Sequence, residues 1–228
     1  MKGLLLFTSI FIMSLPGFAQ GVGFEAGGSL NNMRIGVEGT AANTSLKPAA
    51  RIGIVREEFL SDHFSTQYGI FYNAKGSCLQ YTKTKFDGHA TTVQDINGYV
   101  RVDYFELPIS VLYHSNTAKR NGFFIGGGAY AGAAFGGLLS IDNNFTHING
   151  VTYSINNKFL LDANIGDREE DDFRMLDAGL QLQGGYELKN GLYARMHYSY
   201  GLVDVDPSST MSMKNQSIGV TVGYMFRR

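Results

Sequence analysis

The stretch LDAGLQLQGGYELKNGLYARMHYSYG, residues 176–201, contains both strands and the turn of one β-hairpin. In each half of the stretch apolar residues alternate with polar residues or glycine, which is the period of two expected for a strand with two unlike faces. Between the halves, the connection 189–191 contains Asn190-Gly191, a pair that tolerates the positive φ angles of a tight turn. Each half is about as long as the 9 to 11 residues that a tilted strand needs to cross a bilayer. The stretch therefore predicts a transmembrane β-hairpin.

Six further segments alternate in the same way, which makes eight strands with the hairpin. These segments are 22–31, 48–58, 64–81, 99–113, 122–138 and 216–226. Long connections (about 16 residues around 39–46, then 82–98, 140–174 and 204–215) alternate with short ones (59–63, 114–121 and 189–191). An even strand number, long loops at one end and short turns at the other are typical of bacterial outer-membrane barrels, whose short turns lie in the periplasm. The sequence thus predicts an all-β fold, an eight-stranded antiparallel up-and-down transmembrane β-barrel in the cell outer membrane, with both termini in the periplasm.

The N-terminus and the composition agree with this class. Residues 1–19 have the features of a secretory signal peptide: Lys2, an apolar run, and small residues at Gly17 and Ala19. We expect residues 20–228 to form one barrel domain, because 29 glycines, 13 tyrosines and 16 phenylalanines against four prolines favour an all-β chain. The formal net charge is −1 and the basic residues are scattered, which disfavours a nucleic-acid partner. The single cysteine, Cys78, excludes an internal disulfide.

The polar face of each strand is expected to point into the barrel. Tyrosine and phenylalanine residues lie toward the ends of the apolar faces, as girdles at two membrane interfaces would. Glycines are frequent on the polar face of the strands, where their small size would relieve packing in a narrow lumen. An eight-stranded lumen is just wide enough for side chains to fill, so a porin is not expected.

This orientation predicts a network of ion pairs in the lumen. The polar parity contains Glu25, Arg51, Glu106, Gln181 and Arg195, with Glu57, Gln67 and His197 as neighbours. Buried charges must be paired. We therefore predict that Arg51 and Arg195 bridge Glu25 and Glu106, which would stiffen the wall and plug the lumen.

The chain resembles the PorT-like outer-membrane β-barrel family over nearly all of the sequence after residue 19. The resemblance rests on Lys47-Pro48, on DYFELPI at 103–109, on GYEL at 185–188 and on GYMF at 223–226. It implies an eight-stranded barrel that is inserted by the barrel assembly machinery, and a role similar to that of an accessory of protein secretion. One departure from such barrels is that Arg227 and Arg228 follow the aromatic Phe226.

An enzymatic alternative is raised by His197 and Ser199, which lie on one strand face at the i, i+2 spacing that lets an imidazole approach a hydroxyl. The pair looks like the His–x–Ser of outer-membrane lipid deacylases. A triad also needs an orienting carboxylate, and the nearest candidates, Asp204 and Asp206, fall in a predicted loop. We therefore expect two ordinary lumen residues and no enzyme. A lipid-modifying hydrolase, and a soluble secreted barrel that carries an apolar ligand inside, remain as alternatives.

Other motifs predict no cofactor and no metal site. The run GGGAYA at 126–131 matches a loose phosphate-binding pattern, but no helix follows it. The acidic run DREEDD at 167–172 could bind calcium or bridge lipopolysaccharide through divalent ions, yet it lacks the spaced ligands of a calcium loop. The five histidines, at positions 63, 89, 114, 147 and 197, show no zinc-ligand spacing.

The long connection 140–174 is the candidate for binding a protein partner, because barrel function usually resides in outside loops on a rigid scaffold. It contains enough apolar residues to fold into a hairpin that extends the strands: Ile141, Phe145, Ile148, Val151, Tyr153, Ile155 and Phe159. Further expected partners are outer-membrane lipid and lipopolysaccharide. The leading hypothesis is a non-enzymatic integral outer-membrane protein, structural or accessory to protein secretion or surface assembly.

Overall fold

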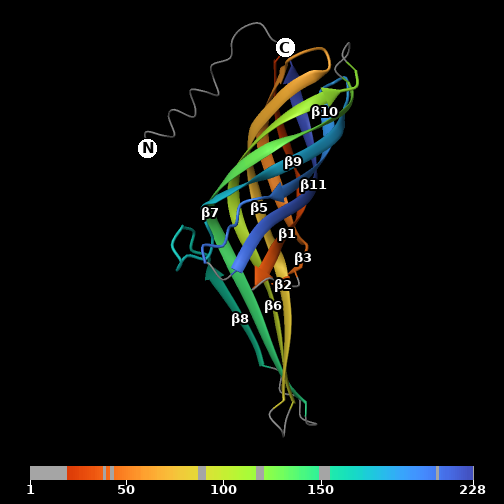
Figure 1. Cartoon of the computed structure of the whole chain (residues 1–228). Coiled ribbons are helices and arrows are strands. Elements are labelled where there is room, and N and C mark those ends of the chain that lie inside the picture. The colour runs from red at the N-terminus through yellow and green to blue at the C-terminus, as the bar shows by residue number, and fades with distance from the viewer. Residues whose placement is uncertain are drawn as a thin grey trace.

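The computed structural model describes residues 20–37, 40–41, 44–86, 91–116, 121–148, 155–208 and 211–227. In these ranges the chain forms eleven β-strands (Figure 1). They are β1 (Gln20–Val37), β2 (Thr40–Ala41), β3 (Thr44–Ser45), β4 (Lys47–Phe59), β5 (Phe64–Phe86), β6 (Thr91–His114), β7 (Gly122–Ile148), β8 (Ile155–Asp162), β9 (Leu176–Glu187), β10 (Leu192–Gly201) and β11 (Met211–Arg227). The described part of the chain contains no helix long and apolar enough to cross a membrane. The predicted signal peptide, residues 1–19, lies outside the described residues.

Eight of the strands close into a ring. Their order is β1, β4, β5, β6, β7, β9, β10 and β11, and β11 pairs with β1 to complete the circle. All these pairings are antiparallel and join strands that follow one another around the ring. The predicted eight-stranded antiparallel barrel is therefore confirmed, and each of the eight predicted segments lies within one of these strands, except that Leu188 belongs to the turn after β9.

The hairpin that predicts the fold forms as expected. Strands β9 and β10 pair from Tyr193↔Glu187 to Gly201↔Gly179. In the turn, the N–H of Leu188 donates to the carbonyl of Leu192 at 2.7 Å. The side chain of Asn190 accepts from the N–H of Leu192 at 3.1 Å, and Gly191 has a φ of 88°. Only a residue without a Cβ adopts that angle at little cost, which explains the glycine.

Parts of all four predicted long loops are strands instead: β2 and β3 lie within 39–46, and β11 begins at Met211 within 204–215. Strand β5 continues to Phe86 and pairs with β6 from Thr91, where a loop at 82–98 was predicted. Strand β7 continues to Ile148 and pairs with β8 inside the predicted loop 140–174. The segments 82–86 and 91–98 also alternate and contain β-branched threonine and valine, but they are polar, and polarity suggested loops. Outside a membrane, polar residues are compatible with both strand faces.

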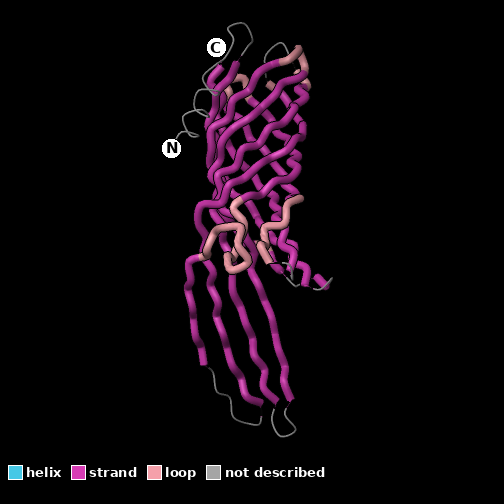
Figure 2. Tube along the Cα trace, turned by 60° about the vertical axis from the view of Figure 1, so that its left-hand side comes forward, coloured by secondary structure: helices cyan, strands magenta, loops and turns pink. Residues whose placement is uncertain are grey.

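These extensions form a four-stranded sheet that projects beyond the ring, which we call the outer sheet (β5 from residue 79, β6 up to residue 98, β7 from residue 139, and β8). Figure 2 shows its strands running side by side away from the barrel, at the end opposite the C-terminus. The hairpin of β7 and β8 agrees with the prediction that part of residues 140–174 extends the strands.

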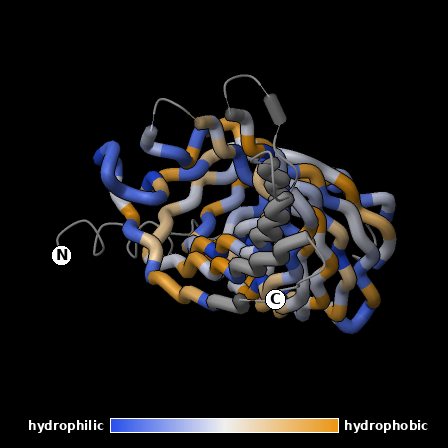
Figure 3. Tube along the Cα trace, turned by 90° about the horizontal axis from the view of Figure 1, so that it is seen from below, coloured by the Kyte–Doolittle hydropathy of each residue, from blue (hydrophilic) through white to orange (hydrophobic). Residues whose placement is uncertain are grey.

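The wall of the ring sorts side chains as the parity predicts. The residues that alternate outward are apolar and exposed, among them Ile54, Ile109, Leu182, Val220 and Phe226. Their neighbours along each strand point inward and are buried, and many are polar. Seen from below, hydrophilic and hydrophobic residues are interspersed along the strands of the barrel (Figure 3). A soluble carrier would need the reverse arrangement, with an apolar interior.

Candidate functional site: the filled lumen

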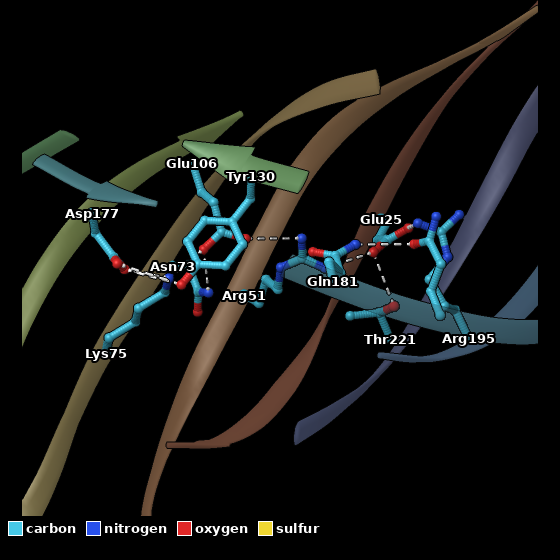
Figure 4. A network of polar contacts seen from close by, with 11 residues as sticks. Glu25, Arg51, Asn73, Lys75, Glu106, Tyr130, Asp177, Gln181, Arg195 and Thr221 are labelled. Atoms are coloured by element: carbon cyan, nitrogen blue, oxygen red, sulfur yellow. Dashed lines mark hydrogen bonds and ion pairs between the residues drawn. The ribbon is translucent and has the colours of Figure 1, made fainter. Parts of the chain in front are cut away.

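The centre of the lumen holds a chain of alternating charges (Figure 4). Arg195 contacts Glu25 at 3.1 Å, and Glu25 also contacts Arg51 at 3.4 Å. Arg51 continues to Glu106 at 3.5 Å. Lys75 then lies 2.9 Å from Glu106 and 2.9 Å from Asp177. We call these six residues the charge chain. It contains three cations and three anions, so its formal charge is zero.

All eight strands of the ring contribute to this arrangement. The charge chain takes one residue from each of six strands: β10, β1, β4, β6, β5 and β9. The hydroxyl of Tyr130 in β7 donates to Asp177 at 3.3 Å. From β11, Thr221 donates to Glu25 at 3.0 Å and Asn215 donates to Asp177 at 3.0 Å. The network therefore links all eight strands around the ring.

The four residues predicted as a lumen network all lie in the charge chain, with one difference in pairing. Arg51 bridges Glu25 and Glu106 as predicted, whereas Arg195 contacts Glu25 and makes no ion pair with Glu106 among the described residues. Sequence reasoning missed Lys75 and Asp177. Both lie at the polar parity of their strands, so the alternation contained the signal, but only the register reveals that they share a partner.

Apolar clusters enclose the charge chain along the barrel axis. Toward the outer sheet lie Met33, Ile35, Val100, Val102, Tyr104, Ala134, Ala163, Phe173 and Val205. Toward the short turns lie Val55, Phe71, Leu112, Phe124, Tyr193 and Met225. Rings also cover the cations: the guanidinium carbon of Arg51 lies 3.8 Å from the ring centroid of Phe71, and Lys75 Nζ lies 4.0 Å from that of Tyr130. The ion pairs are thus shielded from water, which strengthens them.

A second ionic cluster lies at the short-turn end of the lumen. Arg227 contacts Glu57 at 2.9 Å and also pairs with Glu187. His114 Nε2 lies 2.8 Å from the other oxygen of Glu57. This explains the departure noted at the end of β11, because Arg227 follows the inward parity and joins β11 to β4 and β9. Arg228 lies outside the described residues.

Little space remains inside the barrel. At the short-turn end the described residues leave a cavity of about 10 Å³, lined by Glu57, His114, Glu187 and Arg195 among others. That volume holds about one water molecule. The arrangement therefore offers no path for a solute through the described lumen.

His197 and Ser199 are not hydrogen-bonded to each other in the structure. Both point into the lumen and are 2 % exposed. Neither imidazole nitrogen of His197 and not the hydroxyl of Ser199 has a hydrogen-bond partner among the described residues. Asp204 and Asp206 are engaged elsewhere: Asp204 accepts the backbone N–H of Met213 at 2.8 Å, and Asp206 accepts that of Ser208 at 2.8 Å. The hydroxyl of Ser199 is thus buried inside the barrel and has no orienting carboxylate among these residues.

The remaining motifs have structural roles. The run 126–131 lies within strand β7, so it lacks the strand-to-helix turn of a phosphate site. In the acidic run, Asp171 accepts the backbone N–H of Arg168 at 2.9 Å and Asp172 accepts that of Asn164 at 2.8 Å. These carboxylates close local turns. In the described ranges no group of three or more histidine, cysteine or acidic residues is arranged to hold a metal ion.

The segment 163–175 covers the loop end of the barrel. Ala163 and Phe173 pack with Val205 onto the inward residues of the strands. On neighbouring β8, however, Phe159, Leu160 and Leu161 are 50 %, 57 % and 53 % exposed. The predicted binding loop thus contains both a lid over the lumen and an exposed apolar strand.

Comparisons with known proteins place this geometry in a family. Residues 18–206 match the family model described as outer membrane protein beta-barrel domain. A search of curated protein sequences gave no significant match. Among solved structures, the attachment invasion locus protein Ail of Yersinia pestis, in complex with the heparin analogue sucrose octasulfate, is 10 % identical, with 91 % of this chain and 99 % of that chain covered and a TM-score of 0.42. Neisserial surface protein A is 11 % identical, with 90 % and 97 % covered and a TM-score of 0.35. These two likenesses are distant, and the family assignment rests on the family match.

Proposed function

Because this chain belongs to the outer membrane protein beta-barrel domain family, we propose that it is an integral outer-membrane protein without enzymatic activity that acts in protein secretion or surface assembly. Its short turns and both termini would lie in the periplasm, and the outer sheet would project from the cell. The single observation that carries the proposal is the charge chain, to which all eight strands add a residue or a bonding partner.

Because the lumen is filled, a partner would bind on the outside of the barrel. Side chains from opposite walls meet at 2.9 to 3.5 Å along the charge chain, and apolar clusters lie on both sides of it. A pore or an internal substrate site would need that space. The surface available for a partner is then the outer sheet.

The outer sheet has the properties of a protein-binding surface. Within the described residues β8 pairs with β7 alone, so its other edge presents unpaired backbone groups. Such an edge is a template for a further strand. Phe159, Leu160 and Leu161 add exposed apolar side chains on both faces of that edge strand.

Shortened variants test the proposal. Gln80 and Asn97 face each other across β5 and β6, and Leu138 and Asp162 across β7 and β8. Replacing residues 81–96, or residues 139–161, by an Asn-Gly turn would therefore remove the projecting part, in the second case with Phe159, Leu160 and Leu161, and leave the ring intact. We expect both variants to insert and to migrate as folded barrels on unboiled gels. Cells that carry them should lose surface and secreted proteins to the same extent as cells that lack the chain, as measured by quantitative proteomics.

If the shortened variants restore the surface and secreted proteins fully, the outer sheet is not the working surface and the proposal fails. The enzymatic alternative has its own test, because Ser199→Ala would change the acyl composition of membrane lipids only if the hydroxyl were a nucleophile. We expect that composition to be unchanged.

A further inference from the structure

Two cations face each other on the outer wall near the loop end of the barrel. Arg34 of β1 and Lys214 of β11 are directly opposite residues in the ladder between the two strands. Both belong to the outward parity, and like charges directly opposite each other destabilise a sheet. Among the described residues neither makes an ion pair with an acidic side chain. An anion from elsewhere would therefore stabilise the pair.

Neutral groups hold the side chain of Arg34 in place. Its guanidinium carbon lies 3.8 Å from the ring centroid of Tyr200. One terminal nitrogen donates to the hydroxyl of Tyr200 at 2.5 Å, and the other donates to the carbonyl of Gly201 at 2.6 Å. Its Nε is buried and has no hydrogen-bond partner in the described chain. The arginine is thus fixed against the wall with its full charge uncompensated.

Asp204, the acidic residue bonded to the strand beside Lys214, is already engaged. Its Oδ1 accepts the backbone N–H of Met213 at 2.8 Å and that of Asp206 at 3.1 Å. Arg101, an outward arginine on β6, shows the contrast. Its guanidinium makes two contacts of 2.9 Å with the two carboxylate oxygens of Asp103.

From the pair toward the short turns, the outward residues change from charged to polar to apolar, which is the order of headgroup, linkage and acyl chains in a lipid. One step down the ladder Asn32 faces Gln216, which donates to the hydroxyl of Tyr198 at 2.8 Å. The next pair, Leu30 and Ile218, is apolar and exposed. From there the outward positions continue as apolar residues to Phe226. Along the barrel axis, the two cations are therefore followed first by amide and hydroxyl groups and then by apolar side chains.

We infer that Arg34 and Lys214 bind the phosphate of a membrane-lipid headgroup whose acyl chains lie against the apolar wall below. Arginine and lysine are the side chains that bind phosphate oxygens, through charge-assisted hydrogen bonds. Tyrosine beside them matches the aromatic belt at a membrane interface. In the orientation proposed above this is the outer leaflet, where lipopolysaccharide presents phosphates. The choice of leaflet rests on the proposed orientation, but the site does not.

Binding of lipid A to the purified full-length protein in uncharged detergent tests the site. The probes are diphosphoryl lipid A, the same lipid with its phosphates removed, and inorganic phosphate, each followed by native mass spectrometry. We expect the diphosphoryl lipid to bind, with a dissociation constant at least about tenfold larger in Arg34→Gln and in Lys214→Gln, since each variant loses a charged hydrogen bond. Lys189→Gln, an equal charge change in the turn at the other end, should leave binding unchanged.

Lys214→Gln keeps the test valid if Arg34→Gln does not fold, because no hydrogen bond or ion pair of Lys214 is found in the described residues. Folding of each variant is checked by its migration on unboiled gels. Equal binding of the lipid without phosphates, or unchanged binding in the variants, would overturn the inference. Inorganic phosphate that competes at the same concentration as the lipid would also overturn it, because the site would then take a free anion. None of these readouts depends on secretion, so they are separable from the proposed function.

Discussion

The lumen and the outer sheet differ in whether their reactive groups have partners. In the lumen every member of the charge chain is buried, and each has an opposite charge within 3.5 Å. On the outer sheet β8 leaves one backbone edge open and three consecutive apolar side chains exposed. The difference agrees with the proposal that partners bind outside the barrel, while the paired charges inside it contribute to stability. Substitutions in the two regions should therefore differ in both size and kind.

The largest effect is expected for Glu25→Gln. Glu25 pairs with two arginines and accepts hydrogen bonds from Tyr193 at 2.9 Å and from Thr221. Removing its charge leaves Arg195 buried without a partner, which should lower the free energy of unfolding by about 3–5 kcal/mol. Urea unfolding of the barrel in lipid vesicles measures this. The matched control is Glu58→Gln on the outer wall, whose side chain is 32 % exposed and which should lose less than about 1 kcal/mol. Similar losses for the two variants would contradict the comparison.

Next in size is Lys75→Met, which removes the cation between Glu106 and Asp177. We expect a loss of about 3 kcal/mol, because two buried carboxylates then lose a partner. Adding Asp177→Asn should return part of this loss, with a coupling energy of about 0.5–3 kcal/mol in the double-mutant cycle. Additive losses would mean that the two residues do not act as a pair.

A smaller effect is expected for Arg227→Ala at the short-turn end. The side chain joins β11 to Glu57 and Glu187, but it lies at the rim of the lumen, where water reduces the strength of ion pairs. We expect a loss of about 1–2 kcal/mol, seen as a lower temperature at which the folded band disappears on unboiled gels. Lys189→Ala, in the nearby turn, should leave that temperature unchanged. If the two variants behave alike, Arg227 does not lock the end of the barrel.

The smallest effect on stability should come from Leu160→Asp on β8. More than half of this side chain is exposed, and its strand lies outside the ring, so the free energy of unfolding should stay within about 0.5 kcal/mol of the original. The same variant should reduce the surface and secreted proteins that depend on the chain. A destabilised barrel would show that the outer sheet supports the ring and would weaken the contrast drawn above.

Much of the barrel could be predicted from the sequence because a strand in a membrane wall must alternate. Ile54 and Arg51 differ in parity within β4, and that difference alone places one outside and the other inside. The same rule brought Glu25, Arg51, Glu106 and Arg195 into one lumen.

Two features could not be predicted from the alternation: the register between strands, and the strands whose two faces are both polar. The partner of Arg195 depends on how β10 is aligned with β1 through β11, and no local pattern specifies this. Strand ends without an apolar face lack the pattern that identifies a membrane strand, so the polar segments 82–86 and 91–98 predict a loop although they form strands. The cross-strand pair of Arg34 and Lys214 likewise depends on the register between β1 and β11, which the alternation does not specify.

The pair formed by Arg195 and Glu25 has a consequence for assembly. The two residues come from the tenth and the first strand, 170 positions apart, and they approach each other only when β11 closes against β1. Single hairpins that entered the bilayer one after another would carry unpaired charges into hydrocarbon. We therefore expect insertion and closure to be one cooperative event, because a partly closed ring in the bilayer would expose unpaired charges to hydrocarbon.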